Sequence, residues 1–508
     1  MEERIVTDWL DEASICVPEK IAYGDVNREV SYTQLKKEAY KVASFLIKCE
    51  LFKESVAIFM DKTVDCVASF MGVAYSGNFY TPLDAKMPIE RIESILSQLH
   101  TKVIIADSKN IKKIKELSSS YYVIEYTSIL EMPFENGDII SQRRSRIKNT
   151  DIAYVMFTSG STGVPKGVVV SHFALVSYVN WLIGAMSFSE KTILGNQTPF
   201  YFSMSVSDIY GTIACRGTLY MIPKMLFSFP IKLLDYINSK KINTIYWVPS
   251  ALCIVAESGV FEKRNFDYLE KVMFAGEVMP VKQYNIWKRK LPRAFFANLF
   301  GPTETVDICA YYIIDSELNE CDSIPIGYAC EGAELIIIDE DNSLVLPNLN
   351  KDSRIGEMYV AGTILASGYW GDNKKTEEVF VQNPLHNKYP QITYRTGDLV
   401  HYDSKGRLVY DGRKDYQIKH MGHRIEMGEI ESIVGGFSGV SRCVALYDDK
   451  NKSIFLFYIG ECQEEDVIIR LKQKLPVYMV PKKIKRLKYF PVNANGKVDR
   501  AKLKENLV

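Results

Sequence analysis

Hydroxyl and glycine residues gather in one short stretch, residues 151–175, with the sequence DIAYVMFTSGSTGVPKGVVVSHFAL. A strand-forming run, Ile152–Phe157, leads into the turn. Hydroxyls and bare backbone N–H groups on a flexible turn suit the oxygens of a triphosphate, and glycine lets the backbone approach the anion closely. The candidate phosphate-binding residues are Thr158, Ser159, Gly160, Ser161, Thr162, Gly163 and Lys166.

This turn differs from a Walker A loop. In that motif the lysine is followed by Ser or Thr and opens a helix, whereas Lys166 is followed by Gly167 and the strand-like run Val168–Val170. The alternative is an ordinary surface turn, because Gly and Ser are common in such turns. The stretch alone leaves both interpretations open.

The composition of the 508-residue chain is that of a soluble globular protein, with 47% apolar and 24% charged residues. At roughly 100–200 residues per domain, this length predicts two to four domains. Lys plus Arg and Asp plus Glu both number 62. Such a balance argues against nucleic acid or an anionic membrane as the main partner.

The cysteines and histidines give no sign of a disulfide framework or a metal site. Ten cysteines are scattered without a CxxC pair, and six histidines form no ligand cluster. We therefore expect reduced thiols, a cytoplasmic location and no zinc. The first residues lack the features of a signal peptide, and no apolar run approaches the roughly 18 residues of a membrane span.

Helix-like and strand-like segments alternate over the first 400 residues. The apolar spacing predicts helices over Tyr32–Cys49 and Val64–Tyr75, and strands over Val56–Met60, Val103–Ala106 and Tyr122–Glu125. Alternation of this kind predicts an α/β fold of layered sheets and helices.

The pattern changes after Asp398. Leu399–Tyr410 is expected to form a hairpin, and three later segments carry strand or helix signals: Val444–Tyr447, Ile454–Ile459 and Val467–Lys474. We place a domain boundary at Lys414–Asp415, which gives an N-terminal domain over 1–414 and a C-terminal domain over 415–508. The connection is short and charged, so we expect a hinge rather than a tether.

Five further motifs follow in a fixed order along the chain. They are Asn298–Glu304 (NLFGPTE), Gly356–Tyr369, Tyr394–Asp398 (YRTGD), Gly412–Glu426 and Asn495–Arg500 (NGKVDR). With them, the chain resembles the adenylate-forming enzymes, the superfamily of acyl-CoA synthetases, nonribosomal-peptide adenylation domains and firefly luciferase. The match runs from about Val30 to Arg500. The Phe202–Tyr210 and Phe274–Glu277 patterns are most similar to the free-standing D-alanine–carrier protein ligases.

The resemblance implies a large N-terminal domain of layered sheets and helices, and a small, mobile α+β C-terminal domain. It also implies ATP and Mg²⁺ as cofactors. Residues 158–166 would hold the β- and γ-phosphates, and Glu304 would bind Mg²⁺, which favours carboxylate oxygens. Thr303 would lie near the α-phosphate. The other residues implied to bind ATP are Asn298, Phe300, which would stack on adenine, and Gly301.

Three charged residues complete the nucleotide site that the resemblance implies. Asp398 would accept both ribose hydroxyls, as a carboxylate can, and Arg413 would contact the ribose as well. Lys497 would bridge the attacking carboxylate and the α-phosphate, where charge develops. The implied catalytic residues are Lys497, Thr303 and Glu304.

The implied reaction has two steps. The acid attacks the α-phosphorus of MgATP in line and expels pyrophosphate, and a thiol then attacks the acyl-adenylate. The C-terminal domain would rotate about Asp415 between the steps. The chain ends at Val508 without a carrier domain, so the expected acceptor is the phosphopantetheine arm of a separate carrier protein. Free coenzyme A is the alternative.

The acid pocket departs from the amino-acid-activating relatives. These usually have an Asp after the Phe at position 202, where it pairs with the α-ammonium, and this chain has Ser203. An ammonium buried without a charged partner is costly, so an ordinary α-amino acid is not expected. Asp208 is interpreted as structural. The implied pocket residues are Phe202, Ser203, Met204, Ser207, Tyr246, Met273, Ala275, Leu299, Asp307 and Ile308.

Asp307 is the carboxylate of this pocket, among Met, Leu and Tyr side chains. One hypothesis is that it binds an amine displaced from the α-position, as in a β-amino acid. Another is that it accepts a hydrogen bond from a hydroxylated aryl acid, and the alternative is a structural contact with a Lys or Arg. A non-catalytic nucleotide-binding paralogue would be expected to lose Lys497, Glu304 or Asp398, and all three are present.

Overall fold

The computed structural model describes residues 4–116, 121–133, 137–160, 164–319, 322–347, 354–415, 417–448, 451–491, 498 and 500–505. The chain forms two units. The first comprises residues 1–85, 99–156 and 167–414, and the second comprises residues 86–98, 157–166 and 415–508. Because two earlier segments group with the C-terminal residues, the division into 1–414 and 415–508 stays a prediction.

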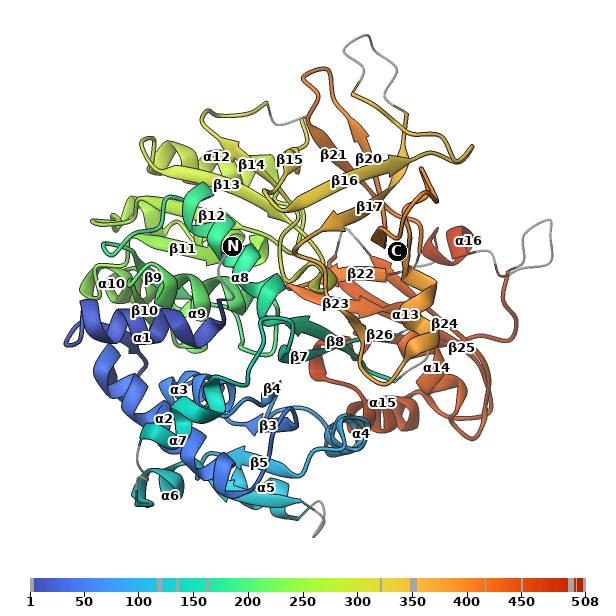
Figure 1. Cartoon of the computed structure of the whole chain (residues 1–508). Coiled ribbons are helices and arrows are strands. Elements are labelled where there is room, and N and C mark those ends of the chain that lie inside the picture. The colour runs from blue at the N-terminus through green and yellow to red at the C-terminus, as the bar shows by residue number, and fades with distance from the viewer. Residues whose placement is uncertain are drawn as a thin grey trace. The chain divides into compact units, whose positions relative to one another are not determined.

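A nine-stranded sheet forms the part of the first unit drawn mainly in green and yellow in Figure 1. Parallel pairing joins its central strands, and α9, α10, α11 and α12 connect them. The strand order is β15 (Tyr328–Ala329), β14 (Ala310–Ile314), β13 (Phe295–Phe300), β12 (Lys271–Phe274), β11 (Thr244–Trp247), β9 (Ile193–Asn196), β10 (Thr218–Met221), β1 (Ile21–Gly24) and β2 (Glu29–Ser31). The connecting helices are α9 (Met204–Ala214), α10 (Pro230–Ser239), α11 (Pro249–Glu257) and α12 (Val281–Lys290).

A seven-stranded sheet contains the first strands that the sequence predicts. Its order is β18 (Gly368–Tyr369), β8 (Lys166–Ser171), β7 (Ile152–Thr158), β4 (Phe79–Leu83), β3 (Ser55–Phe59), β5 (Val103–Ala106) and β6 (Tyr122–Glu125). The three predicted strands are confirmed as β3, β5 and β6. The two predicted helices are confirmed as α2 (Tyr32–Lys48) and α3 (Val64–Tyr75). The Ser31 side chain caps α2 by accepting a hydrogen bond from the Gln34 N–H.

The hairpin predicted after Asp398 is confirmed. It consists of β20 (Ile392–Tyr402) and β21 (Leu408–Arg413), which pair antiparallel. They belong to a five-stranded sheet with β16 (Ala333–Ile338), β17 (Gly356–Gly362) and β19 (Phe380–Gln382). The remaining helices of the first unit are α1 (Val6–Cys16), α5 (Ile111–Lys115), α6 (Tyr126–Glu131), α7 (Gly137–Arg144), α8 (His172–Ala185) and α13 (Asn373–Val379).

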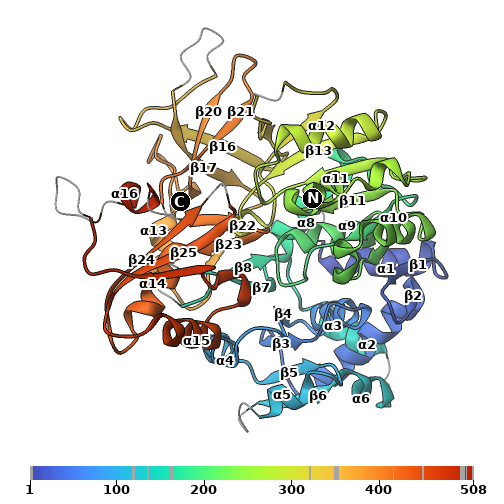
Figure 2. The same ribbon diagram turned by 180° about the vertical axis from the view of Figure 1, so that it is seen from behind.

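The second unit has a small core built on both faces of a three-stranded sheet. The sheet contains β24 (Val440–Asp448), β25 (Ser453–Gly460) and β26 (Lys483–Arg486), and β22 (Gln417–His420) pairs separately with β23 (His423–Glu426). Successive residues of β25 belong to different apolar clusters. Leu456 is in one cluster with Val467, and Phe457 is in the other with Phe490 and Leu503. The helices are α4 (Ile89–Leu99), α14 (Met427–Gly435), α15 (Glu464–Lys474) and α16 (Arg500–Glu505), and Figure 2 labels most of these elements.

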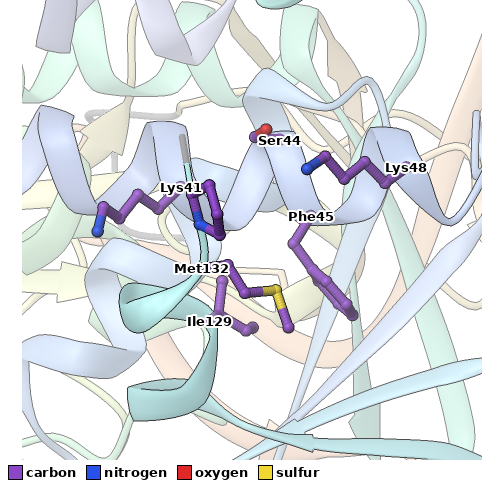
Figure 3. A pocket seen from close by; sticks show the side chains of 7 residues that line it. Lys41, Ser44, Phe45, Lys48, Ile129 and Met132 are labelled. Carbon is purple, nitrogen blue, oxygen red and sulfur yellow. The ribbon is translucent and has the colours of Figure 1, made fainter. Parts of the chain in front are cut away.

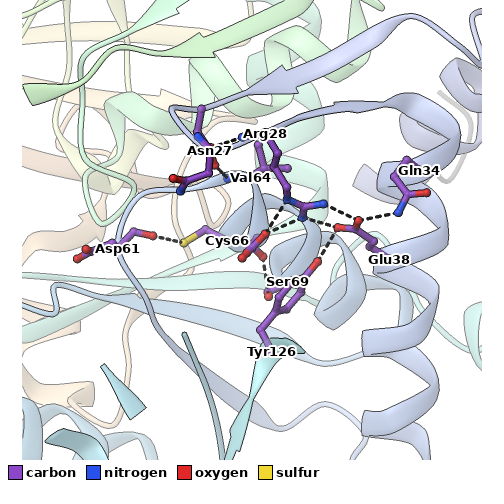
Figure 4. Close-up of polar contacts among 11 residues, drawn as sticks. Asn27, Arg28, Gln34, Glu38, Asp61, Val64, Cys66, Ser69 and Tyr126 are labelled. Carbon is purple, nitrogen blue, oxygen red and sulfur yellow. Dashed lines mark hydrogen bonds and ion pairs between the residues drawn. The ribbon is translucent and has the colours of Figure 1, made fainter. Parts of the chain in front are cut away.

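A buried ionic cluster fixes the helices of the first unit near its N-terminus (Figure 4). Both Oε atoms of Glu38 on α2 accept hydrogen bonds of 2.7 Å from the Arg28 guanidinium. Arg28 also pairs with Asp65 on α3 at 2.6 Å, and the Tyr126 hydroxyl of α6 donates to Glu38 at 2.7 Å. Glu38 is 3% exposed. Burial alone would raise the pKa of Glu38, but the hydrogen bonds from Arg28, Gln34 and Tyr126 lower it below its ordinary value.

A small hollow lies beside α2, as Figure 3 shows. The stems of Lys41 and Lys48 and the side chain of Phe45 form one wall, and Ile129 and Met132 lie opposite. None of these residues belongs to the predicted site. Among the described residues, no helix combines the length and the apolar character that crossing a membrane requires.

The ionic cluster generates a prediction about stability. Replacing Glu38→Gln removes one partner of a mostly buried pair, so we expect a loss of about 2–3 kcal/mol in the free energy of unfolding at pH 7. The folded pKa of Glu38 is lowered, so its contribution is present above the unfolded value of about 4.3 and disappears as the pH falls through the folded pKa. Urea unfolding at pH 7 and in acid measures both effects.

The matched control is Glu131→Gln, which changes an exposed glutamate on α6. Its unfolding should follow the unchanged protein at both pH values. Equal stability of the Glu38 and Glu131 variants at pH 7 would show that the cluster contributes nothing.

Candidate active site

Four of the residues predicted to bind the acid, Tyr246, Met273, Ala275 and Leu299, lie at or just after the carboxyl ends of neighbouring parallel strands, and the others lie around the start of α9 or in the turn after β13. In the row across the sheet, Tyr246 of β11 is paired with Asn196 of β9 on one side and with Met273 of β12 on the other. The carboxyl ends of parallel strands are where α/β sheets bind ligands. Eight of the predicted residues are buried and two, Phe202 and Ser203, are partly exposed; the buried ones are Met204, Ser207, Tyr246, Met273, Ala275, Leu299, Asp307 and Ile308.

Asp307 lies at the centre of a set of hydroxyl groups. Its Oδ2 atom accepts hydrogen bonds from Ser207 Oγ at 2.6 Å, Tyr178 Oη at 3.0 Å and Tyr246 Oη at 3.1 Å. These donors come from α9, α8 and β11. Asp307 itself is 2% exposed. These three partners of the oxygen are all hydroxyl groups, and the role of Asp307 stays a prediction.

The tyrosines of this set remain protonated. Burial, and then the neighbouring Asp307 charge, raise the pKa values of Tyr178 and Tyr246 well above the ordinary value for tyrosine. Each phenol therefore acts as a donor toward the carboxylate. Hydrogen bonds to a carboxylate stabilise its ionised form, and three hydroxyl contacts converge on Oδ2 of Asp307.

A tight turn brings Asp307 into this position. Val306 has φ 65° and ψ −63°, and the Asp307 N–H donates to the Thr305 carbonyl at 2.8 Å. This is the geometry of the rare and strained γ-turn, here at a β-branched residue. The returning chain passes so close to Gly301 that a Cβ there would lie 2.2 Å from the Asp307 carbonyl oxygen. Position 301 therefore requires glycine.

Ser203 and Ser207 lie one helical turn apart along α9. Ser203, at the N-terminal cap, accepts a hydrogen bond from Thr303 Oγ1 at 3.2 Å. Ser207, four residues later, contacts Asp307. Residues i and i+4 lie on the same helix face and about 6 Å apart along the axis. The structure thus places the Asp307 carboxylate one turn beyond the Ser203–Thr303 contact.

Asp208 has a different environment from its neighbour Ser207. It is fully buried, and its Oδ2 accepts a hydrogen bond of 2.5 Å from Asn196 Nδ2. Burial raises the pKa of Asp208 well above its ordinary range, although Asn196 and Lys62 act in the opposite direction. This contact with the end of β9 agrees with a structural role.

The predicted ribose-binding residues lie opposite each other on the β20–β21 hairpin. Arg413 Nη1 donates to Asp398 Oδ1 at 2.8 Å, and its Nη2 donates to the Thr396 carbonyl at 2.9 Å. Asp398 is 3% exposed. The pair is therefore pre-oriented. Phe300, predicted to stack on adenine, packs against Tyr410 of the same hairpin with ring centroids 5.7 Å apart, and Asn298 Nδ2 donates to the Pro325 carbonyl at 2.8 Å.

Glu304, predicted to bind the metal, is fully buried, and its Oε1 accepts a hydrogen bond of 2.6 Å from Tyr369 Oη. The described residues contain no group of three or more His, Cys, Asp or Glu placed to hold a metal ion. A lone carboxylate fits Mg²⁺, which is usually bound through one or two carboxylates together with substrate phosphates and water. It does not fit a metal held by the protein alone.

The described part of the phosphate turn belongs to the second unit. Thr158 Oγ1 is buried without a hydrogen-bond partner among the described residues, which suits a phosphate oxygen as its missing acceptor. Within this unit Ser159 Oγ donates to the Arg424 carbonyl at 2.8 Å, and the Gly160 N–H donates to Glu429 Oε2 at 3.2 Å. Lys166 is 8% exposed. Ser161, Thr162 and Gly163 lie outside the described residues.

The two positions predicted to act in the C-terminal part have separate outcomes. Lys497 lies outside the described residues. Asp415 is exposed, and its Oδ1 accepts a hydrogen bond of 3.1 Å from the Gln417 N–H. Its role as a hinge stays a prediction.

Two tyrosines that contact predicted site residues were not predicted from the sequence. Tyr178 contacts Asp307 from α8, and Tyr369 contacts Glu304 from β18. A buried tyrosine hydroxyl needs a partner, so a tyrosine on an apolar helix was an available signal. It could not identify which carboxylate was the partner.

Comparison with known proteins identifies the family. Residues 10–370 match the AMP-binding enzyme family. The chain is 30% identical to an L-proline–[L-prolyl-carrier protein] ligase of Streptomyces coelicolor over 89% of this chain and 87% of that protein. It is 28% identical to a D-alanine–D-alanyl carrier protein ligase of Lacticaseibacillus rhamnosus over 99% of both.

A solved structure agrees with the fold. The Vibrio cholerae adenylation domain AlmE, in complex with glycyl-adenosine-5'-phosphate, matches with a TM-score of 0.86 at 20% identity over 99% of this chain and 97% of that one. At this identity the likeness shows the fold alone, and it confirms the predicted α/β class. With the family match over most of its length, the chain belongs to the AMP-binding enzymes and is an adenylate-forming ligase.

Proposed function

We propose that this ligase activates a carboxylic acid carrying an amine displaced from the α-position, and passes the acyl group to the phosphopantetheine thiol of a separate carrier protein. The observation that carries the proposal is the Asp307 carboxylate, held by three hydroxyls one helical turn beyond Ser203. The hydroxylated aryl acid is the second candidate, because a carboxylate also accepts a hydrogen bond from a phenol.

Charge favours the amine over the hydroxyl. Removing a carboxylate from water costs several kcal/mol, and an opposite charge recovers more of this cost than a neutral donor does. An ammonium supplies an opposite charge as well as donors. The Tyr246 hydroxyl oxygen keeps acceptor capacity after donating to Asp307, whereas Tyr178 and Ser207 also hydrogen-bond to each other at 2.7 Å. Asp307 and Tyr246 can therefore receive N–H donors of an ammonium.

Position argues against an α-amino acid. Ser203 occupies the position where amino-acid-activating relatives have a carboxylate, and it contacts Thr303, which is expected beside the reacting α-phosphate. The acid carboxylate would lie at this level. The Asp307 contact with Ser207 is about 6 Å further along α9, so the recognised amine would be one or more carbons beyond the α-carbon.

The strained turn supports a functional role for Asp307. A γ-turn at a β-branched residue costs of order 1–3 kcal/mol and persists only where the surroundings enforce it. Such strain clusters at ligand-binding sites. Here it precedes the one residue whose side chain gathers the hydroxyls.

The chemistry assigns each group a task. The acid carboxylate attacks the α-phosphorus of ATP, an acyl-adenylate forms, and pyrophosphate leaves. Thr303 and Lys497 orient the reacting groups and neutralise charge there. Glu304 would hold Mg²⁺, which neutralises phosphate charge, and Asp398 with Arg413 would position the ribose. The thiol then attacks the acyl carbonyl, a thioester forms, and AMP leaves.

The carrier protein is supported by the relatives. Two of them are named as ligases that act on a prolyl or D-alanyl carrier protein. Coenzyme A is the alternative acceptor, because both thiols end the same pantetheine arm.

Asp307→Asn tests the amine. The substitution keeps the shape and removes the charge, so we expect kcat/KM for the best amino acid to fall roughly 10- to 100-fold, as for a lost hydrogen bond to a charged group. ATP–pyrophosphate exchange would be measured with α-, β-, γ- and δ-amino acids, aminobenzoates and hydroxybenzoates.

The control is Asp315→Asn. It changes an exposed aspartate that follows β14, and it should leave every rate unaltered. An unchanged substrate preference in the Asp307 variant would overturn recognition at this residue. A hydroxybenzoate as the best substrate, with activity retained in Asp307→Asn, would establish the second candidate instead.

Glu304→Gln tests the metal. Because the amide is a poorer ligand for Mg²⁺, we expect pyrophosphate exchange to fall about 10²–10³-fold and to need more Mg²⁺ for half-maximal rate. A Mg²⁺ titration of the exchange rate measures this, with the exposed Glu331→Gln as the control. A Mg²⁺ dependence identical to that of the unchanged enzyme would remove Glu304 from the metal site.

The acceptor is tested by mass spectrometry of the product. The enzyme, ATP and the best acid would be incubated with phosphopantetheinylated carrier proteins or with free coenzyme A. We expect a mass increase on one carrier protein, at a much higher kcat/KM than for acyl-CoA formation. Acyl-CoA formation as fast as carrier loading would identify an acyl-CoA ligase.

A further inference from the structure

A chain of three polar side chains joins the two large sheets beneath the proposed acid site. Lys62 follows β3, Asn196 ends β9, and Asp208 lies on α9. Lys62 Nζ donates to Asn196 Oδ1 at 2.8 Å, and Asn196 Nδ2 donates to Asp208 Oδ2 at 2.5 Å. Asn196 and Asp208 are both fully buried. The amide therefore lies between an ammonium group and a carboxyl group.

This arrangement fixes the orientation of Asn196. An amide has a donor end and an acceptor end. The ammonium accepts no hydrogen bonds, so the amide oxygen has to face Lys62, and the Nδ2 group then faces Asp208. The second N–H of Asn196 is then directed to the Thr198 carbonyl at 3.1 Å. Neither an apolar residue nor an acid at position 62 could impose this orientation.

The same residues donate hydrogen bonds to backbone carbonyls of the connection from β9 to α9, which ends at Ser203. Lys62 Nζ donates to the Gln197 carbonyl at 3.1 Å, and Asn196 takes the Thr198 carbonyl. Two later carbonyls of the connection face the first turn of α9. The Ser205 hydroxyl lies within hydrogen-bond distance of the Phe200 carbonyl, at 3.2 Å, and of the Phe202 carbonyl, at 2.7 Å. Buried carbonyls without partners are costly, so removing Lys62 would leave the first part of the connection unsupported.

Two of these three residues, Asn196 and Asp208, adjoin the acid site. Asn196 is paired in the sheet with Tyr246, which contacts Asp307. Asp208 directly follows Ser207, another Asp307 partner. Ser203, at the end of the connection, contacts Thr303. A shift of the connection would therefore move Ser203 and the first turn of α9 relative to Asp307.

We propose that Lys62 is a positioning residue for the carboxylic acid: through Asn196 and Asp208 it holds the Gln197–Ser203 connection and the first turn of α9 in the geometry that binds the acid. The inference rests on the proposed binding of the acid between Ser203 and Asp307. Lys62 acts through these residues and has no part in binding the nucleotide.

The charge state of Lys62 is compatible with this role. Burial lowers its pKa to about 8, although Asp208 raises it. At pH 7 the ammonium form therefore predominates and supplies its three donors, which matches the oxygens it contacts: Asn196 Oδ1, the Gln197 carbonyl and, at 3.5 Å, the Asn196 carbonyl.

Lys62→Met and Lys62→Gln test the proposal in ATP–pyrophosphate exchange with the best acid. Met keeps the length and removes every donor, and Gln keeps an amide donor without the charge. Since small misplacements of binding groups can cost up to 10²-fold, we expect KM for the acid to rise about 10- to 100-fold in Lys62→Met and less in Lys62→Gln. KM for ATP should stay within about twofold. Lys62→Arg should restore much of the acid affinity, because it retains charge and donors.

The matched control is Lys109→Met. Lys109 is exposed and pairs with Asp61, the neighbour of Lys62, so its loss should change neither KM. Equal rises in both KM values in the Lys62 variants, with a lower melting temperature and no recovery in Lys62→Arg, would reduce Lys62 to a stabilising residue and overturn the proposal. An unchanged KM for the acid would overturn it as well.

Failure of this inference can be told from failure of the proposed substrate class. If Asp307→Asn leaves the acid preference unchanged while Lys62→Met raises KM for the acid, recognition of the amine is wrong and the positioning role stands. If Asp307→Asn has its expected effect and the Lys62 variants bind the acid normally, the positioning role is wrong and the substrate class stands.

Discussion

The structure of the candidate acid site depends on satisfying one carboxyl group, Asp307, inside the protein. The free energy of moving such a group out of water is larger than any single hydrogen bond recovers. Three elements that are distant in sequence each supply one hydroxyl to Oδ2. Because α8, α9 and β11 must all come together for this, the buried carboxyl group constrains the packing of the helices on the nine-stranded sheet.

Backbone geometry supplies the rest of the constraint. The chain after β13 has to reverse sharply so that Thr303, Glu304 and Asp307 are directed to different neighbours within five residues. Gly301 makes the close approach possible, and the γ-turn at Val306 completes the reversal. The contacts of Thr303 with Ser203, of Glu304 with Tyr369 and of Asp307 with Ser207 then pin the strained turn at three points. Strain of this kind persists because the surroundings determine it several times over.

The sequence predicted the regular elements and the local motifs well, and for a clear reason. Strands such as Val103–Ala106 and the helix over residues 64–75 are specified by short-range apolar spacing, and the ordered motifs identify the nucleotide chemistry. Ser207 and Tyr246 were predicted beside Asp307 in the pocket, and both contact it. Tyr178 could not be predicted, because it is 129 residues away in sequence and its position on an apolar helix resembles that of any core tyrosine. The pairing of Arg413 with Asp398 was likewise hidden: each was expected to contact the ribose, and the register of the hairpin places them opposite each other. Long-range contacts between polar groups follow from topology, which local patterns do not contain.

Helix α9 separates recognition from support. Consecutive residues of an α-helix differ in direction by about 100°, so Ser207 contacts Asp307 while Asp208 contacts Asn196. The two buried acidic residues therefore belong to different hydrogen-bond networks. Asp208 is linked through Asn196 to Lys62, and Asp307 contacts three hydroxyl groups. Because the support of the helix does not pass through Asp307, residues around the acid can change without disturbing the connection that ends at Ser203. A fold arranged in this way can hold the nucleotide chemistry constant while the acid varies.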